Sequence, residues 1–203
     1  MSATESRDQA RVRTRDAAHA DHRLVRRTLD GDLRAFEDLV GRHQDVVFRV
    51  ASRIVGNEHA EDVSQDAFLR AFHRLGRFRG EASFRTWLLQ ITQNAALSHL
   101  ERATRRALGS DALPDPVDPD ASRQPVSALE RRERQRRLER KLDLLRADYR
   151  SLLVLRDLEG LTYGEIAEIL EMPLGSVKGR LHRARLELIE LLRNNTYDWE
   201  LPA

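Results

Sequence analysis

The chain has 203 residues, enough for one ordinary domain or two small ones, because domains cluster near ~100–150 residues. It carries 35 basic and 33 acidic side chains, 40% hydrophobic and 5% aromatic residues and no cysteine, a composition that indicates a helix-rich protein and excludes disulfides, thiol catalysis and thiolate zinc sites. No apolar run approaches the ~20 residues that cross a bilayer and the start lacks the apolar segment of a signal peptide, so we expect a cytoplasmic protein without membrane insertion.

The first half of the chain shows the apolar spacing of three helices, after residues 1–22, which we expect to be disordered. Apolar residues three, four or seven apart predict helices from about residue 32 to 55 and from about residue 59 to 75. A third helix starts near Ser83, whose hydroxyl can cap it, and runs to about residue 106. The expected buried faces include Leu33, Val40, Val50, Phe72, Phe84 and Leu88.

A proline-rich, acidic segment divides the chain. Four of the six prolines lie within residues 109–125, and residues 111–120 carry four Asp and no basic side chain. Proline lacks a backbone donor and blocks the continuation of a helix. We therefore predict an all-α fold of two small helical domains joined by a flexible acidic Pro/Asp linker over residues 108–126, the second domain containing a helix-turn-helix.

The second half begins with a highly charged helix over about residues 126–146. The segment 160–192 then has the pattern of two helices that cross at a tight turn. Thr162 can cap the first of these helices and Ser176 the second. Glu171 occupies the turn where glycine is usual, and a left-handed backbone there costs about 1 kcal/mol.

The second of these crossing helices has a cationic face. Between Ser176 and Arg185 the sequence holds four basic and no acidic side chains, which suits a helix that enters the major groove of DNA. Arg and Lys reach phosphates and guanine edges, and short polar residues approach the bases. The alternative is a solvated basic face on a structural helical hairpin. The candidate DNA-binding residues are Ser176, Lys178, Gly179, Arg180, His182, Arg183 and Arg185.

Two parts of the sequence resemble extracytoplasmic-function (ECF) RNA polymerase sigma factors, the small members of the bacterial sigma-70 family. The segment GLTYGEIAEILEMPLGSVKGRLHRAR resembles region 4, which reads the promoter −35 element. The first half of the chain resembles region 2, which binds core RNA polymerase and the −10 element. The resemblance lies in the segments AFEDLVGRHQDVVFRVASRIVGNEHAEDVSQDAFLRAF and FRGEASFRTWLLQITQNAALSHLERATRR. The resemblance implies region 2 over residues 23–107, region 4 over residues 127–194 and a tail over residues 195–203.

In region 2 the resemblance implies two sets of contacts. An acidic helix face beside an exposed leucine is expected to dock on the coiled coil of the polymerase's largest subunit, although an ordinary solvated face gives the same pattern. Its residues are Asp62, Gln65, Asp66 and Leu69. A glycine-containing loop and the helix after it are expected to capture a flipped base and the exposed single strand of the −10 element. Their residues are Arg79, Glu81, Ser83, Arg85, Trp87, Gln90, Asn94 and Arg102.

Some of these assignments leave alternatives open. Trp87 can wedge against bases at the duplex fork or belong to the hydrophobic core, whereas Phe84 is expected in the core. The amides of Gln90 and Asn94 can read adenine edges or simply face solvent.

We therefore interpret the chain as an ECF-type sigma factor that binds core RNA polymerase, recognises −35 and −10 elements, promotes DNA melting and is no enzyme. The expected partners are the largest polymerase subunits, promoter DNA and, by resemblance, an anti-sigma factor. No cofactor or metal is expected, because the seven histidines form no i,i+4 ligand pair. The alternative is a stand-alone helix-turn-helix regulator that binds an operator while its first half senses a signal.

Overall fold

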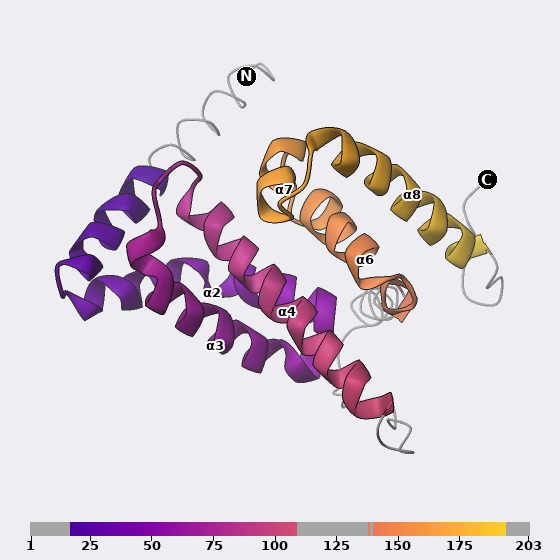
Figure 1. Ribbon diagram of the computed structural model, residues 1–203, viewed down its shortest axis with the longest axis horizontal. Coiled ribbons are helices and arrows are strands. Elements are labelled where there is room, and N and C mark those ends of the chain that lie inside the picture. The colour runs from indigo at the N-terminus through magenta and orange to yellow at the C-terminus, as the bar shows by residue number, and fades with distance from the viewer. Residues whose placement is uncertain (1–16, 109–137, 139, 194–203) are drawn as a thin grey trace, which may run out of the picture. The chain divides into compact units, whose positions relative to one another are not determined.

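The computed structural model describes residues 17–108, 138 and 140–193 (Figure 1). Within these residues the secondary structure is helical, without strands, which confirms the predicted all-α fold. The chain forms two compact units, one built mainly on the helices before residue 96 and the other mainly on those after it. None of the described helices combines the length and the apolar composition that a membrane crossing requires.

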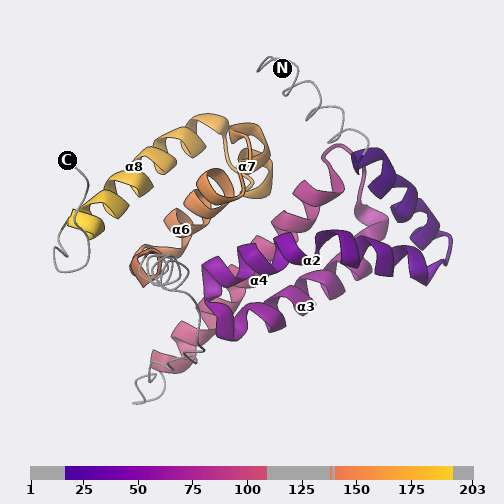
Figure 2. The same cartoon turned by 180° about the vertical axis from the view of Figure 1, so that it is seen from behind.

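The first unit contains the helices coloured from indigo to magenta, which Figure 2 shows from behind. They are a helix over residues 17–29, α2 (Leu33–Val55), α3 (Asn57–Arg74), the 3-10 turn η1 (Leu75–Arg77) and α4 (Phe84–Leu108). The carboxylate of Asp32 caps α2 by accepting a hydrogen bond of 3.1 Å from the backbone of Arg34. Gly56, with φ of 83°, separates α2 from α3, because glycine adopts positive φ without a steric penalty. The predicted helix ends therefore agree with the structure to within about two residues.

The expectation of disorder over residues 1–22 is wrong for residues 17–22, which begin a helix. The buried positions of that helix are Asp21, Val25 and Thr28, three or four residues apart. Only one of the three is apolar, so hydrophobic periodicity gives no signal for this helix. Residues 1–16 lie outside the described residues.

The core of the first unit is formed by one side of each helix. Its buried side chains include Leu39, Val47, Val50, Ala67, Ala71, Phe84 and Leu88. The alanines of α3 are small enough to let neighbouring helices approach closely. Two expected core residues are exposed, Leu33 at 61% and Phe72 at 38%. Leu33 is the first residue of α2, so the rest of the first unit does not cover its side chain.

The second unit comprises residues 140–144, which are helical, and four further elements. These are α6 (Ala147–Leu153), the π-helical turn η2 (Val154–Leu158), α7 (Tyr163–Ile169) and α8 (Leu174–Arg193). α6 packs against α8, and the buried residues of these four elements include Leu152, Leu155, Ile166, Leu181 and Ala184. The linker expected over residues 108–126 lies outside the described residues apart from Leu108, the last residue of α4, and so does the tail at 195–203.

We expect truncation of Leu39 to destabilise the first unit far more than truncation of Leu33 on the same helix. Leu39 is 0% exposed and Leu33 61%, so Leu39→Ala should lower the free energy of unfolding by roughly 2–5 kcal/mol and Leu33→Ala by less than about 0.5 kcal/mol. Urea unfolding followed by Trp87 fluorescence in a Trp199→Phe background measures this, since Trp87 and Trp199 are the two tryptophans. Equal losses in the two variants would contradict the assigned core.

Candidate nucleic-acid interface

The helix-turn-helix begins with a reciprocal cap on α7. The Thr162 hydroxyl oxygen accepts a hydrogen bond of 3.2 Å from the backbone N–H of Glu165. The Glu165 carboxylate in turn accepts bonds of 2.8 Å from the Thr162 backbone N–H and 2.7 Å from its hydroxyl. Such a capping box satisfies backbone donors that a helix start leaves without partners. The predicted role of Thr162 is confirmed.

The turn between α7 and α8 is tight and left-handed. Glu171 has φ of 48° and is the only non-glycine residue with positive φ in the described part of the chain. The backbone N–H of Met172 donates to the carbonyl of Ala167 at 3.0 Å and closes the end of α7. The predicted left-handed Glu171 is therefore confirmed, and with it a local strain of about 1 kcal/mol.

The start of α8 differs from the prediction that Ser176 caps it. The helix begins at Leu174, directly after Pro173, whose carbonyl accepts bonds from Ser176 at 2.8 Å and Val177 at 3.2 Å. Proline is well tolerated at a helix start, because it has no N–H that needs a partner and its φ already suits a helix. Ser176 instead lies in the first turn of α8 and is exposed.

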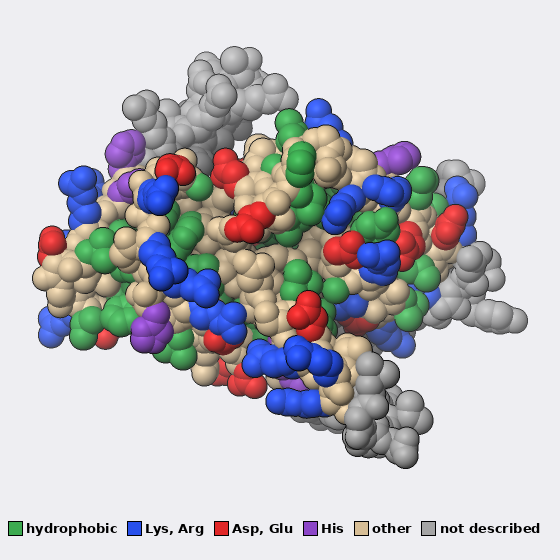
Figure 3. Space-filling view, viewed as in Figure 1, with side chains coloured by type: hydrophobic (Ala, Val, Ile, Leu, Met, Phe, Trp, Pro, Cys, Tyr) green, Lys and Arg blue, Asp and Glu red, His purple; other side chains and the backbone are tan. Residues whose placement is uncertain are grey.

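α8 has a buried side and a cationic side, as predicted. Val177, Leu181 and Ala184 are buried at spacings of four and three. The polar residues Ser176, Lys178, Gly179, His182 and Arg183 are exposed and Arg180 is half-buried. Figure 3 shows Lys and Arg side chains at the surface along α8. Among the described residues, no ion pair engages Lys178, Arg180 or Arg183, so these charges remain available to a polyanion.

Arg185 differs from its cationic neighbours because Asp157 of η2 holds it. The guanidinium forms a two-pronged pair with that carboxylate, Nη2 to Oδ1 at 2.5 Å and Nε to Oδ2 at 3.2 Å. Hydrogen bonding to Asp157, with a further contribution from Tyr163, raises the pKa of Arg185 above its usual value. Sequence reasoning missed Asp157 because it lies 28 residues away, beyond any helical spacing.

Tyr163 is also held by η2. The guanidinium carbon of Arg156 lies 4.6 Å from the centre of the Tyr163 ring, and Nη1 donates to the carbonyl of Leu161 at 2.7 Å. Stacking of a guanidinium on an aromatic face is favourable by about 0.5–2 kcal/mol. The π-helical turn therefore fixes the segment before α7 and, through Asp157, one side of α8.

On α3 an acidic strip, Asp62, Gln65, Asp66 and Leu69, lies at the surface as predicted. Leu69 is 61% exposed, and the strip continues into an ion pair of 2.7 Å between Asp66 and Arg70. A groove of about 540 Å³ lies beside it between α2 and α3. Its lining includes Val40, Phe48, Gln65 and Phe68. Sequence analysis did not single out Phe48, which is 43% exposed and supplies apolar surface next to the strip.

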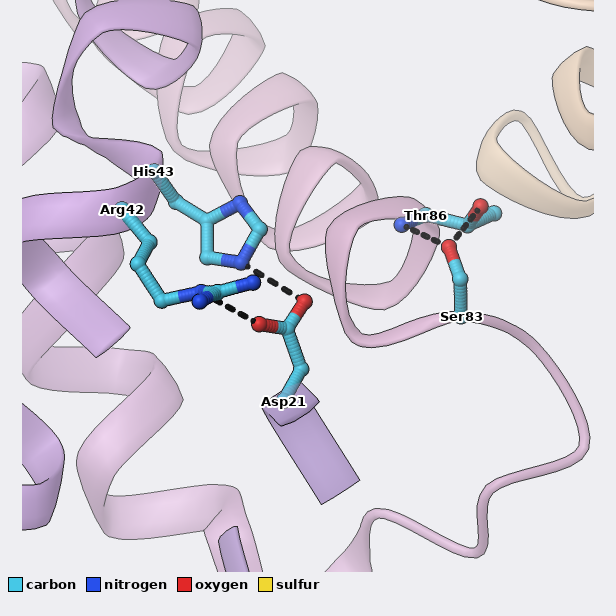
Figure 4. Close-up of polar contacts among 5 residues, drawn as sticks. All are labelled: Asp21, Arg42, His43, Ser83 and Thr86. Atoms are coloured by element: carbon cyan, nitrogen blue, oxygen red, sulfur yellow. Dashed lines mark hydrogen bonds and ion pairs between the residues drawn. The ribbon is translucent and has the colours of Figure 1, made fainter. Parts of the chain in front are cut away.

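The loop predicted to contact the −10 element, called the −10 loop below, spans residues 77–83 and runs from the last residue of η1 to the start of α4. Ser83 closes it by capping α4, its Oγ accepting a bond of 3.0 Å from the backbone of Thr86 (Figure 4). Arg79 and Glu81 extend from the loop, with side chains 83% and 81% exposed. Between them Gly80 has φ of 75°, a conformation that side-chain-bearing residues rarely adopt.

An aromatic cluster lies at the start of α4. The ring centre of Trp87 is 5.3 Å from that of Phe78 and 5.7 Å from that of Phe84. Phe84 is fully buried, as predicted, whereas Trp87 is half-buried. Trp87 therefore packs in the cluster and keeps part of its ring accessible, so neither of its two predicted roles is excluded.

The other −10 candidates follow α4. Gln90 is half-buried and Asn94 exposed, one helical turn apart. Arg85 is half-buried, and Arg102 is exposed and donates to the carbonyl of Ser98 at 3.1 Å. In the part of the chain that the structure describes, no group of three or more His, Cys, Asp and Glu side chains could hold a metal ion.

Fold and site together define an all-helical protein whose second unit contains a helix-turn-helix with a cationic face on its second helix. Two family models match the chain, Sigma-70 region 2 over residues 39–106 and Sigma-70, region 4, over residues 135–188. The RNA polymerase sigma-H factor of Pseudomonas aeruginosa is 36% identical over 174 residues, 81% of this chain and 90% of the relative. The ECF RNA polymerase sigma-E factor of Escherichia coli K12 is 36% identical over the same shares. The chain therefore belongs to the sigma-70 family of RNA polymerase sigma factors, in its extracytoplasmic-function group.

Solved structures agree with this assignment. CnrH, solved in complex with the cytosolic domain of CnrY, has a TM-score of 0.62 and 28% identity, with 87% of this chain and 99% of that chain covered. RpoE of Bartonella quintana, solved with the anti-sigma factor NepR, has a TM-score of 0.63 and 24% identity, with 78% and 96% covered, and supports the fold. No comparison favours a stand-alone regulator, and the region 2 match occupies the half where such a protein would need its sensor.

Proposed function

We propose that this chain is the promoter-specificity subunit that gives core RNA polymerase a set of −35 and −10 sequences and helps to melt the −10 region. The observation that carries the proposal is the presence of both sigma-70 segments, region 2 and region 4, in order on one chain. In this role the chain catalyses no reaction itself, needs no cofactor and works in the cytoplasm with the polymerase. Its partners are core RNA polymerase and promoter DNA.

For the −35 element, α8 supplies the reading surface. Lys178, Arg180 and Arg183 reach phosphates and guanine edges once the helix lies in the major groove. Ser176 and His182 add hydrogen-bonding groups near the bases. A Cβ at Gly179 would meet nothing within 4 Å, so the backbone is open there to a close approach of DNA. Arg185 is paired with Asp157 and supports the orientation of α8. It can contact DNA only if its ion pair with Asp157 opens.

For the −10 element, the −10 loop and α4 capture melted DNA. Arg79 and Glu81 supply charged and hydrogen-bonding groups around a flipped base, and Ser83 fixes where the loop ends. Trp87 offers a partly accessible ring on which a base can stack, worth about 1–3 kcal/mol. Four residues along α4 complete the surface, the amides reading adenine edges and the arginines holding phosphates. They are Arg85, Gln90, Asn94 and Arg102.

Core RNA polymerase docks on the acidic strip and on the groove beside it. The carboxylates Asp62 and Asp66 and the amide of Gln65 steer and orient a basic partner, while Leu69 and Phe48 supply apolar contact area. We further propose that an anti-sigma factor covers polymerase-binding surfaces of this chain. The similar protein CnrH was solved in a complex with the cytosolic domain of CnrY, which supports this proposal.

Run-off transcription tests the proposed function. Purified chain added to core RNA polymerase should start transcripts at promoters that share an upstream two-part motif, found by mapping transcript 5′ ends after overproduction. Core RNA polymerase alone is the control. A chain that shifts an operator fragment by itself but never directs core RNA polymerase to initiate is instead a stand-alone regulator.

We expect Arg183→Gln to weaken promoter binding more than Arg185→Gln does. Loss of one phosphate contact makes the plot of log binding constant against log salt concentration less steep by about 0.9. Arg183 can make such a contact, whereas Arg185 is already paired with Asp157. Fluorescence anisotropy of a labelled promoter duplex with holoenzyme, across a KCl series, measures both slopes. Arg193→Gln, at the far end of α8, is the charge-matched control. Equal loss of slope for Arg183 and Arg185 would show that the ion pair opens on DNA.

Leu69→Ala should lower the affinity for core RNA polymerase at least about tenfold, because burying a leucine in an interface is worth roughly 1.5–3 kcal/mol. Leu33→Ala is the matched control, since both leucines are 61% exposed. Competition against a labelled sigma factor measures the affinities, and thermal unfolding checks that neither variant is misfolded. If both variants bind as the unchanged chain does, the polymerase does not dock on the acidic strip.

A further inference from the structure

The helix over residues 17–29 is anchored to α2 through a buried carboxylate (Figure 4). Asp21 is 4% exposed, and its Oδ1 accepts a bond of 2.8 Å from Nε of Arg42. Its Oδ2 lies 2.9 Å from Nε2 of His43, which is also buried. A buried carboxylate with both oxygens engaged strongly restrains the elements it joins. The position of this helix on α2 is therefore fixed.

The next residue of the same helix, His22, contacts the −10 loop. Its ring meets that of Phe78 edge-on, with centres 5.4 Å apart. A Cβ built on Gly80 would lie 2.8 Å from Cε1 of His22, so the loop backbone comes close to the edge of the imidazole. A side chain at this position would have to displace the imidazole and adopt a φ of 75°, which residues other than glycine rarely do.

These contacts close a ring through the first unit. The His43 ring lies 5.4 Å from that of Phe84, the first residue of α4, and Phe84 lies 5.7 Å from Phe78. The path thus runs from the first helix to α2, to α4, to the −10 loop and back to the first helix at His22. His22 is therefore positioned by the contacts of Asp21 with α2, and Phe78 by its packing on Phe84.

The −10 loop has little else to fix its backbone. Among the described residues, the backbone hydrogen bonds nearest to it are those of Phe78 with Leu75 and of Trp87 with Ser83, and none involves residues 79–82. The exposed side chains of Arg79 and Glu81, on either side of Gly80, form an ion pair of 4.0 Å within the loop itself. The packing of His22 against Phe78 and Gly80 therefore joins the loop to the first helix, while the packing of Phe78 on Phe84 and Trp87 joins it to α4.

We infer that His22 is a positioning residue for promoter melting, which holds the −10 loop in the conformation that receives the flipped base. The inference rests on the proposed function, and it extends the melting apparatus to a helix that lies before the segment matched by the region 2 model, residues 39–106. A loop ordered in advance loses less conformational entropy when it captures a base, so the captured state forms faster and more completely. His22 itself need not touch DNA.

The test separates promoter binding from promoter opening. Holoenzyme carrying His22→Ala should form the closed complex within about twofold of the unchanged protein but open the −10 region about tenfold more slowly, because the freed loop must be ordered during base capture. Permanganate reactivity of −10 thymines against time gives the opening rate, and anisotropy at low temperature gives closed-complex affinity. His19→Ala, on the same helix and exposed, is the control and should open DNA at the unchanged rate.

A second variant covers the case in which His22→Ala disturbs the fold. Gly80→Ala leaves the sequence of the first helix unchanged and puts a Cβ 2.8 Å from Cε1 of His22, so either the loop or the imidazole must move and their packing is lost. It should therefore slow opening to a similar degree. The double variant should open no more slowly than the slower single variant, because both changes break one contact. Losses that multiply in the double variant, or an unchanged opening rate in both single variants, would overturn the inference.

The outcomes for the inference and for the proposed function are distinct. If unchanged holoenzyme opens no promoter, the proposed function fails. If unchanged holoenzyme opens the promoter and both single variants open it equally fast, the positioning role of His22 fails and the proposed function stands. Arg183→Gln, which should weaken closed-complex binding and leave the opening rate of bound promoter unchanged, shows that the two readouts are independent.

Discussion

Burial of one side of every helix is the constraint on which both units depend. Leu39, Val50 and Leu88 fill the first unit, and Ile166, Leu181 and Ala184 fill the second. A helix that buries one stripe must present the opposite stripe to solvent, since side chains repeat every 3.6 residues. The acidic strip of α3 and the cationic face of α8 are therefore exposed because the apolar residues of the same helices are not.

Local polar contacts then decide where each helix starts, and so where the functional loops lie. Asp32, Ser83 and Thr162 each accept a hydrogen bond from a backbone N–H in the first turn. Such caps contribute about 1 kcal/mol each. The cap at Ser83 has a second consequence, because it defines the end of the −10 loop and sets the direction in which α4 leaves it. Capping thus links helix stability to the placement of the residues proposed to bind DNA.

Strain and charge pairing meet in the second unit. The left-handed Glu171 costs about 1 kcal/mol, which the packing of α7 and α8 around the turn offsets. η2 contributes Asp157, which neutralises one of the cations of α8 and leaves Lys178, Arg180 and Arg183 without carboxylate partners among the described residues. The unpaired positive charge on α8, which is proposed to meet DNA, is therefore smaller and more narrowly placed than a count of basic residues indicates.

The sequence by itself determined most of the helices, the turn at Glu171 and the cap at Thr162. It also determined that the acidic strip and the cationic face are exposed. All of these follow from hydrophobic periodicity and from residues close together in the sequence. Only the tertiary structure decided which contacts cross between elements. Asp157 pairs with Arg185, which lies 28 residues further along the chain. The helix over residues 17–29 is held by the polar contacts of Asp21 rather than by an apolar stripe. His22 likewise reaches Gly80 only once that helix is docked. Local pattern specifies which face of a helix is apolar, but the partner that this face or a polar side chain meets depends on how the whole chain folds.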